Sequence, residues 1–148
     1  MLAIDANILF YALNSASPDH LAAMRFLQEH ESREDVAISE FTLVELYVLL
    51  RNPAVLDRPL GESDAVAVVR AYRRHPRWRL LGFPPESQAL HDAVWEIAGR
   101  HPFARRRIID VRTAFTLLRQ GVKEFATANV KDFENLGFAH VWNPLLSV

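Results

Sequence analysis

Apolar residues are arranged along this chain in two alternating patterns. Short, uninterrupted apolar runs are typical of buried parallel strands, and we predict five strands, at residues 2–4, 36–38, 78–83, 125–127 and 139–142. Between the first four runs, apolar side chains recur every three or four residues, as they do in helices that bury one face. We predict six such helices, at residues 7–13, 18–28, 41–50, 63–74, 85–98 and 110–120. The predicted order is β-α-α-β-α-α-β-α-α-β-β.

This order indicates the fold class. A strand that returns to a parallel neighbour through helices places those helices on the faces of the sheet. The length of 148 residues, with 50% hydrophobic and 24% charged side chains, fits one domain with its own core. We therefore expect a single α/β domain over residues 1–148, with a mainly parallel central sheet between two layers of helices.

The composition excludes several kinds of chemistry. The chain has no cysteine, so disulfides, thiolate metal sites and cysteine nucleophiles are absent, and any metal must bind oxygen or imidazole. No apolar stretch approaches the roughly 18 residues that a membrane span requires, and the first residues lack the pattern of a secretory signal. We expect a cytoplasmic protein that does not enter the membrane.

Charge is unevenly distributed, although the net charge is only −1. Residues 1–69 hold 4 basic and 11 acidic side chains, whereas residues 70–112 hold 10 basic and 4 acidic ones. Nearly all of the basic residues are arginines, whose planar guanidinium matches phosphate geometry better than lysine does. An acidic first half and an arginine-rich middle are therefore the two electrostatic features of the chain.

Two acidic residues stand where a predicted element begins or ends. Asp5 follows the first predicted strand, and ligands of open parallel sheets bind outside the carboxyl ends of the strands. Asp110 is predicted to open the helix at residues 110–120. Aspartate is also a common helix N-cap, so each residue is either a cap or part of a functional site.

Glu45 lies within a helical segment whose neighbouring positions are apolar, and no cation is within helical reach of it. A lone buried carboxylate costs several kcal/mol or gives up its charge. Either Glu45 lies at the edge of the apolar stripe and reaches water, or a metal ion or cationic group compensates it. Together, Asp5, Glu45 and Asp110 suggest a cluster of three carboxylates around a hard cation.

Five short motifs carry a resemblance to a known family. They are residues 4–9 (IDANIL), the Glu45 helix with its stop at residues 51–53 (RNP), residues 109–110 (ID), residues 125–133 (FATANVKDF) and residues 141–144 (VWNP). Each motif is short, but their order and spacing together are specific and extend over nearly the whole chain. The sequence resembles the PIN-domain ribonucleases, and among them the VapC-type toxins of bacterial and archaeal toxin–antitoxin pairs.

The resemblance implies a PIN-like three-layer fold and a metal-dependent endoribonuclease that uses Mg²⁺ or Mn²⁺. Asp5, Glu45 and Asp110 match the three core acids of the family, which hold the metal. The sequence departs from the family at Asn129, which stands where many members have aspartate, with Asp132 three residues later. An amide oxygen can bind a metal or its water but adds no charge, which leaves open the number of metal ions and which residue fills the fourth position.

Further roles follow from the same resemblance. Asn7, Thr127 and Asp132 match or neighbour positions that support the site. RNA phosphates, which the acids repel, would be guided by four arginines: Arg105, Arg106, Arg107 and Arg112. Hydrolysis by a metal-activated water would leave a 5′-phosphate and a 3′-hydroxyl. The resemblance also implies a small antitoxin that covers the acidic site, and a homodimer.

Two other functions are compatible with these residues. An Asp after the first strand also begins the active site of haloacid-dehalogenase-type phosphatases, but Asn7 cannot act as their general acid. A catalytically inactive PIN-like module that binds RNA or protein is the other alternative, because the fourth acidic position is weakened. RNA cleavage that stops in an Asp5→Ala variant would distinguish the nuclease from both.

Overall fold

The computed structural model describes residues 1–146, and a five-stranded parallel sheet lies at its centre. The strands are β1 (Leu2–Ile4), β2 (Val36–Ser39), β3 (Arg79–Leu81), β4 (Glu124–Ala126) and β5 (His140–Trp142). Their order across the sheet is β3-β2-β1-β4-β5, and every neighbouring pair is parallel. The first strand is therefore central, and the chain builds outward from it first to one side and then to the other.

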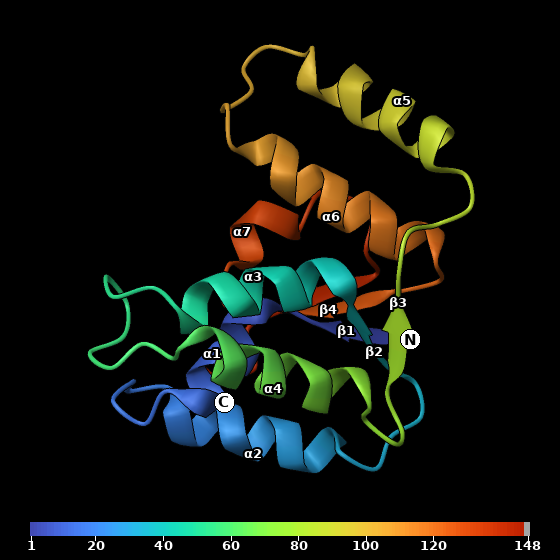
Figure 1. Cartoon of the computed structure of the whole chain (residues 1–148). Coiled ribbons are helices and arrows are strands. Elements are labelled where there is room, and N and C mark those ends of the chain that lie inside the picture. Colours follow the sequence, from blue (N-terminus) through green and yellow to red (C-terminus); the bar gives the residue numbers. More distant parts are fainter. Residues whose placement is uncertain (147–148) are drawn as a thin grey trace.

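Helices cover both faces of this sheet (Figure 1). They are α1 (Ala6–Leu13), α2 (His20–His30), α3 (Glu40–Leu50), α4 (Glu62–Arg73), α5 (Ser87–Ala98), α6 (Arg107–Arg119) and α7 (Val130–Phe133). Helices α1–α4 pack on one face, and α5–α7 pack on the other. This arrangement confirms the predicted three-layer α/β fold. Within residues 1–146, no helix is long and apolar enough to cross a membrane.

The strands supply both cores because alternate side chains of a strand point to opposite faces of the sheet. In β1, Leu2 and Ile4 join the core on the α1–α4 side, while Ala3 joins the core on the α5–α7 side. In β4, Phe125 is fully buried beneath α5–α7, and Ala126 faces the other layer. A central strand buried on both faces explains why residues 2–4 form an uninterrupted apolar run.

The structure differs from the prediction most clearly in one strand and two helices. The strand predicted at residues 78–83 is only Arg79–Leu81, because the Trp78 indole is packed in the core and its Nε1 donates a 3.0 Å hydrogen bond to the His30 carbonyl. Helix α6 begins at Arg107, a turn before the predicted start, and Ile108 packs against the core there. The four-residue helix α7 was not predicted, because one turn is too short to show a periodic pattern.

Candidate active site

Asp5 directly follows β1, the central strand of the sheet. The chain adds β2 and β3 on one side of β1 and then β4 and β5 on the other. Ile4 of β1 pairs with Ala126 of β4, so Asp5 and Thr127 are the first residues beyond the carboxyl ends of these two central strands. Backbone hydrogen bonds continue past the strands, from the Asp5 N–H to the Ala126 carbonyl at 3.0 Å and from the Thr127 N–H to the Trp142 carbonyl at 3.0 Å. In open α/β sheets, such a switch point is the usual place for a ligand site.

The carboxylate of Asp5 is held in one orientation by its neighbours. Its Oδ1 accepts the Ala6 N–H at 2.8 Å, and its Oδ2 accepts the Thr127 hydroxyl at 2.6 Å and the Asn7 amide at 3.0 Å. Asp5 is therefore the N-cap of α1, and this cap uses only its Oδ1, so the capping role does not exclude a second role for the carboxylate. Three of its four acceptor positions are occupied, which leaves one for a further partner.

Asn7 and Thr127 connect the start of α1 to the segment that follows β4. The Asn7 Nδ2 also lies 3.3 Å from Thr127 Oγ1, and its Oδ1 accepts the Ala128 N–H at 3.2 Å. Thr127 Oγ1 accepts the Asn129 N–H at 3.0 Å while it donates to Asp5. Because one hydroxyl offers a single proton and two acceptor positions, these contacts use all of its capacity and fix its rotamer.

The acids predicted from the sequence influence one another electrostatically. Burial raises the pKa of Asp5, which is only 8% exposed; its hydrogen bonds oppose this rise, and the charge of Asp110 adds to it. Burial, followed by the charges of Asp5 and Asp110, raises the pKa of Glu45 to about 7. The fold therefore brings three acids that are far apart in sequence into one negative region.

Glu45 shows both of the alternatives that the sequence left open. Glu45 is exposed on α3, so its carboxyl group reaches water. The protein around the carboxyl group still excludes enough solvent to raise the pKa of Glu45. Arg112 on α6 partly offsets this rise in pKa, and it is a cation that the α3 sequence alone could not reveal. The Arg112 guanidinium lies over the Phe41 ring, 4.7 Å from its centroid.

Asp110 lies in the first turn of α6 but does not open it, so of the two alternatives left open for this residue the N-cap role is excluded. Burial raises the pKa of Asp110, the charge of Asp132 raises it further, and Arg107 and Arg106 lower it. A fourth negative charge near Asp110 thus comes from Asp132. Asn129 is exposed at the N-terminal end of α7, where its backbone N–H binds Thr127. The exposed Arg105 has no comparable influence on these acids.

Within residues 1–146, no arginine or lysine forms an ion pair with Asp5, Glu45 or Asp110. Carboxylate oxygens that repel one another are the donors that hard divalent cations prefer, so the residues fit such an ion by chemistry and by charge. Their arrangement is less complete: no three acidic or histidine side chains in the described part of the chain already form a coordination shell.

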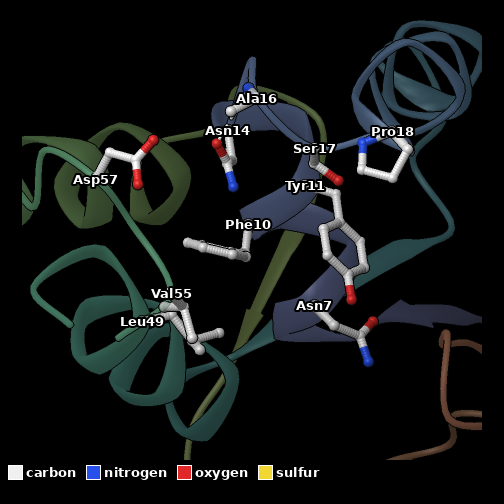
Figure 2. Close-up of a pocket in the computed structure, with 10 residues that line it drawn as sticks. All are labelled: Asn7, Phe10, Tyr11, Asn14, Ala16, Ser17, Pro18, Leu49, Val55 and Asp57. Carbon is white, nitrogen blue, oxygen red and sulfur yellow. Dashed lines mark hydrogen bonds between the residues drawn. The ribbon is translucent and has the colours of Figure 1, made fainter. Parts of the chain in front are cut away.

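Asn7 is one of the residues that line a cavity of about 500 Å³ (Figure 2). The same side chain donates to Asp5 Oδ2, which connects the cavity to the acids. The walls of the cavity come from α1, the α1–α2 connection, the end of α3 and the loop before α4. The sequence did not predict this cavity, because two stretches that are far apart in the chain, residues 7–18 and 49–57, form it together. One signal was present: Asn7, Phe10, Tyr11 and Asn14 have the spacing of a single helix face, with an amide at each end.

Comparison with known proteins places this fold in a class. The family model for the PIN domain matches residues 2–139, and the chain belongs to the PIN-domain family. It is 48% identical over 147 residues to Ribonuclease VapC24 of Mycobacterium tuberculosis, in strains CDC 1551 / Oshkosh and H37Rv, with 99% of each chain covered. The resemblance stated from the sequence motifs is thereby confirmed.

Solved structures agree on the fold. The crystal structure of Mycobacterium tuberculosis VapC20, described as a sarcin-ricin loop cleaving toxin, matches with a TM-score of 0.67 and 22% identity over 93% of this chain and 96% of that one. FitAB bound to a DNA fragment matches with a TM-score of 0.66 and 20% identity, covering 100% and 98%. FitAcB from Neisseria gonorrhoeae also gives 0.66, with 21% identity, covering 97% and 98%.

Proposed function

We propose that this chain is a metal-dependent endoribonuclease and the toxin of a toxin–antitoxin pair. The observation that carries this proposal is the repulsion among Asp5, Glu45 and Asp110 at the switch point of the sheet. None of the ion pairs within residues 1–146 uses these acids. The support for the proposal from relatives is the 48% identity to Ribonuclease VapC24 along the whole chain. Asn129 and Asp132 complete the proposed site.

In this proposal, Asp5, Glu45 and Asp110 hold Mg²⁺ or Mn²⁺, and Asp132 adds negative charge beside Asp110. A bound divalent ion supplies a Lewis acid for a phosphoryl oxygen and lowers the pKa of a water molecule. Thr127 and Asn7 orient the Asp5 carboxylate and keep one of its acceptor positions free. Asn129 offers an exposed amide at the start of α7.

The basic residues of α6 and of the segment before it have the complementary task. Arg106 and Arg107 lie close enough to lower the pKa of Asp110, and Arg112 does the same for Glu45. RNA phosphates bound by these arginines would lie beside the acids, which would otherwise repel them. Arg105 is exposed on the same segment, and we include it in the proposed contact with RNA phosphates.

A cleavage assay tests this function. The purified protein, freed of any partner, is expected to cut structured or single-stranded RNA with Mg²⁺ or Mn²⁺, to leave 5′-phosphate ends and to stop with EDTA. Asp5→Ala and the more exposed Glu45→Gln should both abolish cutting, whereas the matched Asp92→Asn on α5 should not. Equal RNA integrity with wild type and Asp5→Ala across metals would exclude the enzyme.

An inactive PIN-like binding module is the second candidate, favoured by the uncharged Asn129 and by the absence of a formed coordination shell within residues 1–146. RNA binding without cleavage in any divalent metal would establish it. An Asn129→Asp variant gives the decisive comparison. If that variant cuts RNA and wild type does not, the missing charge explains the inactivity.

The proposed partners are a small antitoxin, which covers the acidic site, and a second copy of the chain. Solvent-exposed apolar side chains on α2, α3 and α5 provide surface for such contacts: Leu21, Val44, Val48 and Trp95. Coexpression with the neighbouring open reading frame is expected to yield a complex and to relieve growth arrest in the cytoplasm. Light scattering of the purified chain measures the proposed homodimer. Absence of both a complex and growth arrest would remove the toxin assignment.

A further inference from the structure

The cavity beside the acids has walls of two kinds (Figure 2). Phe10, Tyr11, Leu49 and Val55 give it apolar surface, and Val55 is 43% exposed at its edge. Asp57 and other polar side chains supply hydrogen-bonding groups, and in Figure 2 the Asp57 carboxylate points toward Asn14. A flat, mostly apolar group with polar atoms along one edge fits such walls.

The cavity lies beside the acids at which we propose that an RNA phosphate binds. Asn7 lines the cavity and also donates to Asp5 Oδ2, so the two sites are one side chain apart. No arginine, lysine or histidine is among the residues that line the cavity, whereas the arginines near the acids come from α6 and the segment before it. A phosphate is therefore favoured on the α6 side of the acids, and an uncharged group is favoured on the α1 side.

We propose that this cavity binds one unpaired guanine of the RNA substrate, next to the phosphate that is cut. This inference rests on the proposed ribonuclease function. A volume of about 500 Å³ is sufficient for a nucleoside. Sequence-specific recognition of RNA depends on unpaired bases that stack on aromatic side chains and expose their pairing edges.

Asp57 determines the choice of base. A carboxylate accepts hydrogen bonds but donates none when ionised, and its two oxygens can accept two neighbouring donors. The pairing edge of guanine presents adjacent N1–H and N2–H donors. Adenine and cytosine present one donor beside a ring acceptor, and uracil presents one donor between two carbonyl oxygens. Within residues 1–146, Asp57 is not used in an ion pair, so its carboxylate is available.

Nucleoside binding provides a test without metal and without cleavage. Methyl resonances of Leu49 and Val55 are expected to shift on titration of the metal-free protein with guanosine, and less with adenosine, cytidine or uridine. Asp57→Asn should weaken guanosine binding by about fivefold or more, since one of two bonds is lost. The exposed Asp92→Asn on α5 is the matched control. If no nucleoside moves these resonances, or if both variants behave alike, the proposal is wrong.

Cleavage of hairpins that differ in one loop nucleotide gives a second test. Wild type should prefer the guanine hairpin in kcat/KM, and Val55→Trp, which fills the cavity at its exposed edge, should reduce that preference about tenfold. Leu146→Trp is the control, because Leu146 is 70% exposed and lies outside the cavity. Cleavage with no base preference would overturn the guanine site and leave the ribonuclease intact.

The remaining outcomes separate the two proposals. Guanosine binding by a protein that cuts no RNA would support the nucleobase site and overturn the enzymatic function. Unchanged RNA cleavage in Val55→Trp, together with weaker binding of the coexpressed partner protein, would assign the cavity to that protein and overturn the guanine proposal.

Discussion

Thr127 Oγ1 donates a 2.6 Å hydrogen bond to Asp5 Oδ2 and so joins two residues that are 122 positions apart in the sequence. Each residue directly follows a central strand, and the parallel pairing of β1 with β4 places them side by side. The hydroxyl lowers the pKa of Asp5 against the effect of burial, which raises it. Thr127 therefore favours the ionised form of a carboxylate that would otherwise hold its proton.

A Thr127→Val variant tests this relationship. Removal of the hydroxyl leaves Asp5 Oδ2 with one donor fewer, so we expect a loss of about 1–3 kcal/mol in the free energy of unfolding. The pKa of Asp5 should rise further, and RNA cleavage should fall by about 10- to 100-fold. The acidic limb of the pH–rate profile should move to higher pH. Thr127→Ser, which keeps the hydroxyl, should restore most of the activity.

Glu45 gives a pH dependence of stability in metal-free protein. Its pKa is about 7 in the folded state and near its ordinary value of 4.5 in the unfolded chain, so the folded state binds more protons between these values. The contribution of Glu45 to stability is therefore full below pH 4.5 and is lost as pH rises through 7. Glu45→Gln should remove this loss. Urea unfolding in EDTA at pH 5 and pH 8 measures it, and an unchanged pH dependence in the variant would contradict the assignment.

The order of the elements along the chain and the position of Asp5 after the first strand could be predicted, because both depend on local patterns. A short apolar run followed by helical spacing identifies β1 and α1, and a parallel sheet then places Asp5 at the carboxyl edge. The start of α6 was missed because Ile108 packs against a distant part of the core, which no local pattern reveals. The prediction for β3 was too long because it counted Trp78 as a strand residue. The Trp78 side chain instead packs in the core and donates to the His30 carbonyl.

The contacts that complete the site were beyond a single sequence for the same reason. Arg112 reaches the region of Glu45 from another helix, and Asp132 affects Asp110 from α7, which itself was not predicted. The roles of Asn7 and Thr127 were available only through the family resemblance, since their hydrogen bonds span the chain. The spacing of residues within one helix or strand predicts on which face of that element a side chain lies. Which residue of another element it then contacts depends on how the helices and the sheet pack together.

Arginines beside the acids should govern the salt dependence of RNA binding. Arg107→Ala is expected to weaken binding to all RNAs and to reduce the slope of log K against log salt by about 0.7–0.9, which corresponds to one phosphate contact. Arg25→Ala on α2, an exposed arginine away from the acids, is the control. Measurements of the dissociation constant at several salt concentrations give the slope. Equal slopes for wild type and Arg107→Ala would remove this residue from the interface.

Glu45→Gln should have opposite effects on stability with and without a divalent metal. Without metal at pH 8, the variant lacks a charge that Asp5 and Asp110 repel, so it should melt at a higher temperature than wild type. With Mn²⁺ at about 100 times its dissociation constant, wild type should gain about 2.7 kcal/mol, and the variant should gain much less because it has lost a ligand. Asp92→Asn should behave as wild type in both conditions. A cation that binds between these acids relieves their repulsion, and this must stabilise the folded protein. If wild type gains no stability from Mn²⁺ or Mg²⁺ at pH 8, the acids do not hold a metal.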